Sequence, residues 1–154
     1  MALLSKSCVY GIRAAIYLAL DHESHPEKNG SDFTPISKIA KDLNISGHFL
    51  TKILQQLTSR ELLASFRGPR GGVRLNRPSS DIKLLEIVDA IDGIKIFEDC
   101  ALGLDGCGSY SPCPIHHQWA AQREQLREVF EVETLERLSH NTKELGMRIG
   151  LEIA

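Results

Sequence analysis

Three cysteines lie close together late in the chain, and a histidine follows the last of them. Six residues separate Cys100 from Cys107, and five separate Cys107 from Cys113. His116 comes three residues after Cys113. Thiolates and an imidazole are ligands for Zn²⁺ and for iron–sulfur clusters. Structural zinc sites usually bring ligands in pairs separated by about two to four residues, so the longer spacers favour a cluster. Structural zinc, a redox-active disulfide and three unrelated thiols are the alternatives.

The cysteines fall in an irregular segment rich in glycine and proline. Residues 98–114 contain five Gly or Pro and no apolar periodicity. Ordering such a loop without a nucleus would cost much conformational entropy. Cys113 precedes Pro114, and we expect it to be the N-cap of the next helix, where the helix dipole favours a thiolate. The segment therefore predicts a metal-binding loop at the foot of a helix.

Two short amphipathic segments open the region 35–78. Thr34 is expected to cap a first helix that begins at Pro35 and ends at Asn44, and Ser46 to cap a second. The apolar residues of the second helix repeat at helical spacing, which leaves a polar outer face. The residues expected on that face are Gly47, His48, Thr51, Lys52 and Gln55.

Two apolar runs, 62–66 and 73–75, then predict strands joined by a glycine-rich turn that carries Arg67 and Arg70. Eight Lys or Arg and two acidic residues lie between positions 36 and 77, although the whole chain has a net charge of −2. A polyanion would bind this region and be repelled by the rest. The order of elements predicts a winged helix-turn-helix that binds double-stranded DNA. The alternative is an ordinary α+β module whose charges are solvated.

Helices are expected before and directly after this region. The first covers residues 5–22, and a buried helix follows the wing over 82–91, with residues 78–81 offering its caps. The apolar stripe expected on the first helix is Val9, Ile12, Ile16, Ala19 and Leu20.

A long helix is expected beyond Pro114, followed by a short one over 134–145. Apolar positions spaced by four and three form a seam, which predicts that the long helix pairs with its copy in a twofold dimer. The seam consists of Ile115, Trp119, Gln122, Leu126, Val129 and Glu133. The expected fold is mainly α with a small β-hairpin wing, divided into a DNA-binding domain (1–92), a cysteine-rich loop (93–114) and a dimerisation helix with its tail (115–154).

Composition excludes several classes of protein. With 154 residues, 42% of them hydrophobic and 25% charged, the chain is not disordered. No segment approaches the roughly 18 uninterrupted apolar residues of a membrane span, and no cleavage pattern of a signal peptide is found. We therefore expect a cytoplasmic protein with reduced thiols. The sequence contains no phosphate-binding glycine loop, no nucleophile motif and no pair of carboxylates in a recognisable catalytic motif. We therefore do not expect the protein to be an enzyme.

The motifs together resemble the IscR/NsrR-like family of bacterial winged-helix regulators. The resemblance rests on SKSCVYGIRAAIYLA, IAKDLNISGHFLTKILQQL, LLASFRGPRGGVRL, LLEIVDAIDG and CALGLDGCGSYSPCPIHHQW, and it runs from about residue 4 to 138. It implies a homodimeric regulator, expected to be a repressor, whose operator binding is modulated by a 2Fe-2S or 4Fe-4S cluster, with 2Fe-2S favoured. The cluster would sense redox state, nitric oxide or cluster status. A winged-helix regulator with zinc or no metal, controlled by a metabolite or protein partner, is the alternative.

The resemblance also implies roles for individual residues. The cluster ligands would be Cys100, Cys107 and Cys113, with His116 as the fourth. Carried over in the same way, the DNA contacts would be Ser46, His48, Thr51, Lys52, Arg67 and Arg70.

Two departures from the family pattern concern the cluster. The first spacer has six residues where five are usual. Other members take a carboxylate ligand from the partner's N-terminal helix, but Cys8 and Val9 stand near that position here. Cys8, His117, and an exogenous ligand or an open position therefore remain alternatives to His116.

Overall fold

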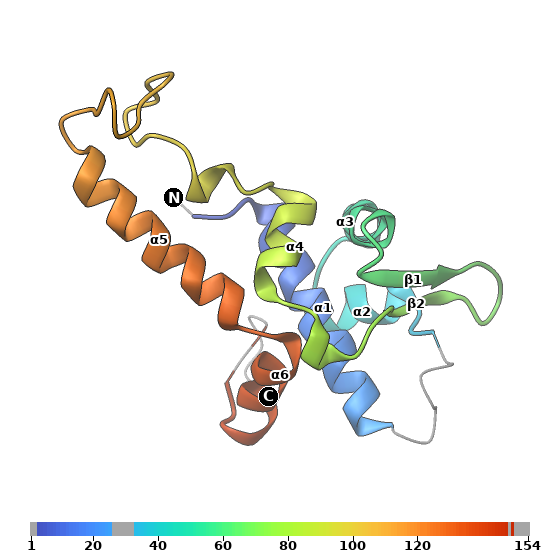
Figure 1. The fold of residues 1–154 in the computed structure, drawn as a ribbon. Coiled ribbons are helices and arrows are strands. Elements are labelled where there is room, and N and C mark those ends of the chain that lie inside the picture. The colour runs from blue at the N-terminus through green and yellow to red at the C-terminus, as the bar shows by residue number, and fades with distance from the viewer. Residues whose placement is uncertain (1–2, 26–32, 148, 150–154) are drawn as a thin grey trace.

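The computed structural model describes residues 3–25, 33–147 and 149, which form a helical protein with one β-hairpin. The hairpin follows the third helix, and the last two helices follow the cysteine-rich loop (Figure 1). The elements are α1 (Lys6–Ser24), α2 (Ile36–Leu43), α3 (Gly47–Ser59), β1 (Leu63–Phe66), β2 (Gly72–Leu75), α4 (Leu84–Ile91), α5 (His116–Val132) and α6 (Leu135–Glu144). The expected mainly α fold with a small wing is confirmed.

The helix-turn-helix is formed by α2 and α3. Asn44 ends α2 in the left-handed conformation (φ 53°), and the backbone N–H of Ile45 donates to the carbonyl of Ala40 at 2.9 Å. α3 then begins after Ser46, as expected, although the side chain of Ser46 makes no capping hydrogen bond. One side of α3 is buried, and its members are Leu50, Ile53, Leu54 and Leu57.

The wing is an antiparallel hairpin in which Leu63 pairs with Leu75 and Phe66 with Gly72. Thr34 adds a bridge to its second strand, because Thr34 and Val73 exchange backbone hydrogen bonds of 2.8 and 2.9 Å. Thr34 is therefore not the N-cap of α2; Pro35 occupies that position. A Cβ on Gly72 would lie 2.1 Å from the carbonyl oxygen of Thr34, so glycine permits this close approach.

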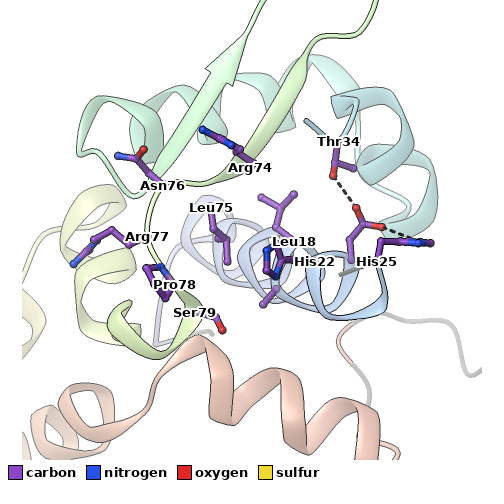
Figure 2. A pocket seen from close by; sticks show the side chains of 12 residues that line it. Leu18, His22, His25, Thr34, Arg74, Leu75, Asn76, Arg77, Pro78 and Ser79 are labelled. Atoms are coloured by element: carbon purple, nitrogen blue, oxygen red, sulfur yellow. Dashed lines mark hydrogen bonds and ion pairs between the residues drawn. The ribbon is translucent and has the colours of Figure 1, made fainter. Parts of the chain in front are cut away.

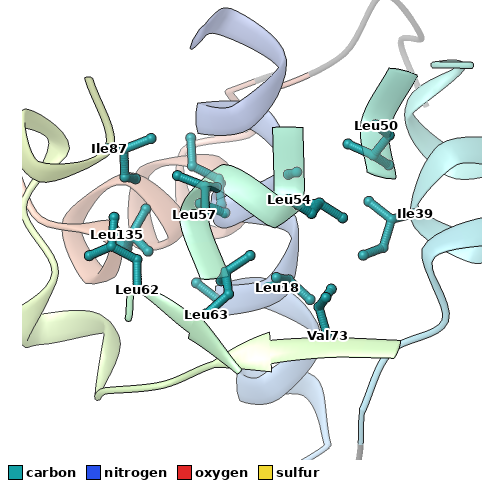
Figure 3. Close-up of a cluster of buried hydrophobic side chains, with 14 of the residues drawn as sticks. Leu18, Ile39, Leu50, Leu54, Leu57, Leu62, Leu63, Val73, Ile87 and Leu135 are labelled. Carbon is teal, nitrogen blue, oxygen red and sulfur yellow. The ribbon is translucent and has the colours of Figure 1, made fainter. Parts of the chain in front are cut away.

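The main core lies where α1 crosses the helix-turn-helix and the wing. Figure 3 shows apolar side chains from α1, α2, α3, the wing, α4 and α6 meeting there. The stripe expected on α1 is partly wrong, because Val9 is 36% exposed whereas Ala14 and Leu18 are buried. α3, α4 and α6 all pack against α1, so small residues fill the interfaces that large apolar residues were expected to fill. Gly11 illustrates this, since a Cβ there would lie 2.3 Å from Cδ1 of Ile91.

α4 is buried as expected, but its cap differs from the expectation. Ser79–Asp81 forms a short 3-10 turn, and Lys83 is the N-cap of α4. The carboxylate of Glu86 accepts the backbone N–H of Lys83 at 2.9 Å, which satisfies one donor at the helix start. Leu84, Ile87 and Val88 are the buried residues of this helix.

A second, smaller core joins α1 and α4 to the last two helices. It contains Cys8, Val88, Phe97 and Phe130, and the rings of Phe97 and Phe130 lie 5.3 Å apart. From this core, α5 projects away from the winged body, which is the part formed by α1, α2, α3 and the hairpin. The cysteine loop lies at the end of α5 that is farther from that body (Figure 1). Among the described residues, no helix has the length and apolar character needed to cross a membrane.

Candidate metal centre and nucleic-acid interface

The structure brings the three cysteines of residues 98–114 together. The sulfur atoms of Cys100, Cys107 and Cys113 all lie within 4.8 Å of one another, and those of Cys100 and Cys113 are 3.7 Å apart. Nδ1 of His116 lies 3.3 Å from the sulfur of Cys107. Three sulfurs thus lie in one small volume with an imidazole nitrogen beside one of them, and these donor types suit Zn²⁺ or an iron–sulfur cluster.

Backbone N–H groups point at two of these sulfurs. The N–H of Leu102 donates to Cys100, and that of Cys113 donates to Cys107, each at 3.4 Å. Donation from the backbone of Leu104 and of Leu102 lowers the pKa of Cys100 to about 7, so a large share of this thiol is ionised near neutral pH. The N–H of Cys113 also lowers the pKa of Cys107, but desolvation and the neighbouring thiols outweigh it and the pKa is raised. The loop therefore stabilises the thiolate of Cys100, the form that binds metal, but not that of Cys107.

The helix start differs from the expectation for Cys113. Ile115 is the N-cap of α5, and His116 is its first residue. Cys113 lies two residues before Ile115. It begins a turn that is closed by a 3.0 Å hydrogen bond, in which the N–H of His116 donates to the carbonyl of Cys113. It is the most buried of the three loop cysteines, at 8% exposure. The turn, rather than an N-cap position, holds Cys113 next to the start of α5.

The other candidate ligands are Cys8, which lies apart from the three loop sulfurs, and His117, which lies beside His116. Cys8 is fully buried in the smaller core, and burial and the nearby carboxylate of Asp92 raise its pKa to about 12. Such a thiol is a poor metal ligand in this conformation. His117 is exposed, and its ring lies 5.3 Å from that of His116, with the two rings edge to face.

Two residues of α5 hold the start of the loop. Trp119 was expected in the apolar seam of the long helix, but it is only half-buried, and its indole N–H donates to the carbonyl of Asp99 at 2.8 Å. The guanidinium of Arg123 donates to the same carbonyl at 2.7 Å and also to that of Glu98. Spacing in the sequence could not reveal these contacts, because they join side chains to backbone carbonyls some twenty residues away.

Replacing Trp119 with phenylalanine should loosen this loop without unfolding the protein. The ring is kept, but one hydrogen bond, worth about 0.5–1.5 kcal/mol, is lost. We expect amide hydrogen exchange at residues 102–107 to accelerate by roughly 2- to 13-fold, the equivalent of that energy. Gln118→Ala changes an exposed neighbour on the same helix and should leave the exchange rates unchanged. Equal rates in wild type and Trp119→Phe would contradict this anchoring role.

The residues expected to contact DNA lie on two surfaces of the winged body. Ser46, His48 and Lys52 are exposed at the start of α3, whereas Thr51 is half-buried and its hydroxyl donates to the carbonyl of Gly47 at 2.8 Å. Arg67 and Arg70 are exposed in the turn of the wing.

Aromatic residues at the wing were missed from the sequence. Phe66 is 57% exposed beside Arg67, and its ring stacks on that of Phe33 at 5.6 Å. The guanidinium of Arg74 lies over the ring of Phe33 at 4.9 Å from its centroid. Ala64 and Phe66 pair with Arg74 and Gly72, so the hairpin carries an aromatic and cationic face that only its register defines.

Polar contacts connect the first turn of α1 to the end of α4. The backbone N–H of Ser5 donates to the carboxylate of Asp92 at 2.8 Å, and its hydroxyl donates to the same carboxylate. The hydroxyl oxygen also accepts the N–H of Cys8 and so caps α1. Asp92 directly precedes the link to the cysteine loop, so this contact ties α1 to the chain that leads into the loop.

Comparisons with known proteins agree on one family. The Rrf2 family, described as iron-dependent transcriptional regulators, matches residues 4–141. The chain is 30% identical over 138 residues to the regulator IscR of Cronobacter sakazakii, covering 90% of this chain and 80% of the relative. It is 28% identical over 150 residues to the regulator NsrR of Oceanobacillus iheyensis, covering 97% of each.

A solved structure extends the agreement to the fold. CymR, the global cysteine regulator of B. subtilis, superposes with a TM-score of 0.72 at 25% identity, over 93% of this chain and 100% of that one. The resemblance drawn from the sequence motifs is thereby confirmed, as is the expectation of a DNA-binding transcriptional regulator and not an enzyme. The chain belongs to the Rrf2 family of transcriptional regulators.

Proposed function

We propose that this regulator is a cytoplasmic homodimer, a repressor, whose operator binding responds to an iron–sulfur cluster. Cys100, Cys107 and Cys113 would hold the cluster, with His116 as the fourth ligand and 2Fe-2S as the favoured type. The observation that carries the proposal is the convergence of three sulfurs within 4.8 Å, with the imidazole nitrogen 3.3 Å from one of them. Residues 1–92 would read DNA, 93–114 would hold the cluster and 115–154 would pair two copies.

The DNA contacts would come from α3 and the wing. Ser46, His48, Thr51 and Lys52 lie at the start of α3, the part of a recognition helix that meets base edges in the major groove. Arg67 and Arg70 would contact phosphates or the adjacent minor groove. In a twofold dimer the two recognition helices would meet half-sites about 10 bp apart, or a multiple of that spacing.

Exposed apolar side chains at the two ends of α5 support pairing of two chains. Ile115, Val129 and Val132 are 43%, 53% and 59% exposed. The seam expected from the sequence is modified, since Trp119 faces the cysteine loop and Leu126 packs into the smaller core. Ile115, Val129 and Val132 remain exposed within the described part of the chain, and a second copy of α5 would cover them.

Replacing Val129 with glutamate should convert the dimer to a monomer. Val129 is exposed, so the subunit fold should persist, while a charge in the last turn of the pairing helix would be desolvated on association. Light scattering should give half the wild-type mass. Leu145→Glu places the same charge at an exposed apolar position after α6, and it should remain dimeric. A dimeric Val129→Glu protein would contradict pairing through α5.

The route from loop to DNA would pass through two sets of contacts. Trp119 and Arg123 hold the loop start to α5, and Asp92 holds the first turn of α1. A change in the order of the loop would therefore alter both the pairing helix and the helix beneath the recognition helix.

Anaerobic purification followed by iron and sulfide analysis tests the proposal. We expect about equal amounts of iron and acid-labile sulfide, visible absorption, and operator binding that differs between the loaded and cluster-free protein. Colourless protein with stoichiometric zinc, or loaded and cluster-free forms with the same operator affinity and footprint, would reject it.

A second candidate is a winged-helix regulator with structural zinc or no metal, controlled by a metabolite or a protein partner. The similarity to CymR, described as a cysteine regulator, favours it. Metal analysis of the same preparation separates the two candidates, because only the first requires iron and sulfide.

A further inference from the structure

The hairpin carries an exposed aromatic ring on the face that points away from α1. Phe66, the last residue of β1, is 57% exposed. Arg74 pairs with Ala64, two residues before Phe66, so Arg74 and Phe66 share this outer face. Figure 2 shows the other side of β2, where Leu75 points toward α1 while Arg74 points away from that helix. The outer face therefore contributes nothing to the main core, and its residue types call for another explanation.

Contacts behind the Phe66 ring hold it in place. The ring stacks on that of Phe33, with 5.6 Å between the centroids and 29° between the planes. The guanidinium of Arg74 lies over the Phe33 ring, 4.9 Å from its centroid. A single exposed apolar side chain is ordinary on a protein surface. Two stacked rings with a cation beside them are different, because their side chains are already ordered and would lose little further entropy on binding a partner.

The charges around this stack favour a polyanion as the partner. Residues 62–76 contain three arginines, Arg67, Arg70 and Arg74, and no acidic residue. Within the described part of the chain, none of these three arginines forms an ion pair. An apolar surface beside uncompensated positive charge would repel a second copy of itself. Duplex DNA complements it, because the phosphates of its backbone stand next to the apolar C–H groups of its deoxyribose rings.

We propose that Phe66 packs against deoxyribose rings in the wall of the DNA minor groove. Arg67 and Arg70 in the turn would contact phosphates or the groove, and Phe66, at the base of the turn, would meet the sugars beside them. The inference rests on the proposed contact of the wing with DNA, and it adds an apolar contribution that does not depend on base sequence. Burying the ring releases water and not counterions, so this contribution is insensitive to salt.

The first test is fluorescence anisotropy with a labelled duplex that the wild-type protein has selected from a random-sequence pool. Phe66→Ala should bind this duplex about tenfold more weakly, with an unchanged slope of log K against log salt concentration. Phe66→Leu keeps most of the apolar area and should lose about threefold or less. Leu145→Ala shortens a similarly exposed side chain after α6 and should bind like wild type. Wild-type affinity in Phe66→Ala, or a slope that falls with the affinity, would overturn the proposal.

Photocrosslinking keeps the contact testable if Phe66→Ala folds poorly. Phe66→p-benzoylphenylalanine retains an aromatic side chain, and its excited ketone abstracts hydrogen from nearby C–H groups, those of deoxyribose included. We expect near-ultraviolet light to join this variant covalently to the selected duplex. Leu145→p-benzoylphenylalanine is the matched control and should give no adduct with DNA. An adduct with a second protein chain in place of DNA, or equal yields at the two positions, would reject the contact.

The Arg67→Ala, Arg70→Ala double variant separates this inference from the proposed function. All variants are compared at the same iron content. If the double variant loses affinity and salt slope but Phe66→Ala binds like wild type, the wing still contacts DNA and only the apolar contact is rejected. If the double variant also binds like wild type, the wing does not contact DNA, and the proposed wing contacts fail together with this inference.

Discussion

Replacing Cys107 with alanine is expected to abolish the visible absorption of anaerobically purified protein while leaving the dimer intact. Cys107 lies at the centre of the proposed ligand group, beside His116 and within reach of the two other sulfurs. Replacing a residue that only supports a metal ligand lowers metal affinity by roughly 10- to 100-fold. Replacing a ligand itself should lower the affinity by more than this. The fold should persist, because the hydrogen bonds of the Cys107 sulfur join its own loop and the start of α5, away from both apolar cores of the described residues. Iron and sulfide analysis, absorption spectroscopy and light scattering measure the three outcomes.

Cys8→Ala is the matched control for this experiment. Cys8 is buried among apolar side chains and lies outside the sulfur group, so its removal should leave iron content and spectrum unchanged. If Cys8→Ala lost the cluster instead, a ligand from α1 would replace His116 in the proposal. A Cys107→Ala protein with wild-type iron and sulfide would reject the three-cysteine site.

Replacing both wing arginines, Arg67 and Arg70, with alanine is expected to weaken operator binding by about 10- to 100-fold at low salt. Both side chains are exposed in the turn of the hairpin, so the fold should not depend on them. Each phosphate contact releases counterions, and the slope of log K against log salt concentration should fall by about 2 for each bound subunit. The loss should be similar across operator sequences, since phosphate contacts position the protein without reading bases. Fluorescence anisotropy with labelled operator between low and moderate salt measures both quantities.

A variant that removes two positive charges elsewhere controls for net charge. Arg137 and Lys143 lie on α6, outside the wing and the recognition helix, and both are exposed. The Arg137→Ala, Lys143→Ala double variant should keep the wild-type salt slope. A slope that falls equally in both double variants would assign the effect to overall charge and not to the wing.

The sequence predicted the winged region well because local signals there agree with the tertiary contacts. Three local signals each fix the boundary of a helix or strand within a few residues. They are Asn44 in the left-handed conformation, the apolar period of α3 and the glycine-rich turn of the wing. Thr34 is the exception. Its residue type favours an N-cap, but its backbone pairs with Val73 and its hydroxyl with Asp21, partners that no local pattern reveals.

The faces of α1 and α5 were predicted less well, because several elements share each helix. α1 is packed by α3, α4 and α6, so its buried positions include Ala14 and Ala15, while Val9 stays exposed. α5 uses Trp119 for the cysteine loop and Leu126 for the smaller core, which interrupts a seam that looked continuous in sequence. A single apolar period cannot separate contacts to three different partners.

For the candidate metal centre, the sequence indicated the ligand types, and their convergence depends on backbone geometry. The spacing of the cysteines did not specify that the sulfurs of Cys100 and Cys113 come within 3.7 Å of each other. Nor did it indicate that the N–H groups of Leu102 and Cys113 point at sulfur. These features follow from turns in which Gly103 and Gly106 have positive φ values of 66° and 71°, accessible to glycine at little cost.

The hydrogen bonds between α5 and the cysteine loop determine which loop positions can change in sequence without loss of the attachment. Trp119 and Arg123 bind the carbonyl oxygens of Glu98 and Asp99, groups that every amino acid possesses. Mutations that change the side chains at those two positions would leave the attachment in place. Substitutions at positions 98 and 99 could therefore accumulate without releasing the loop from α5.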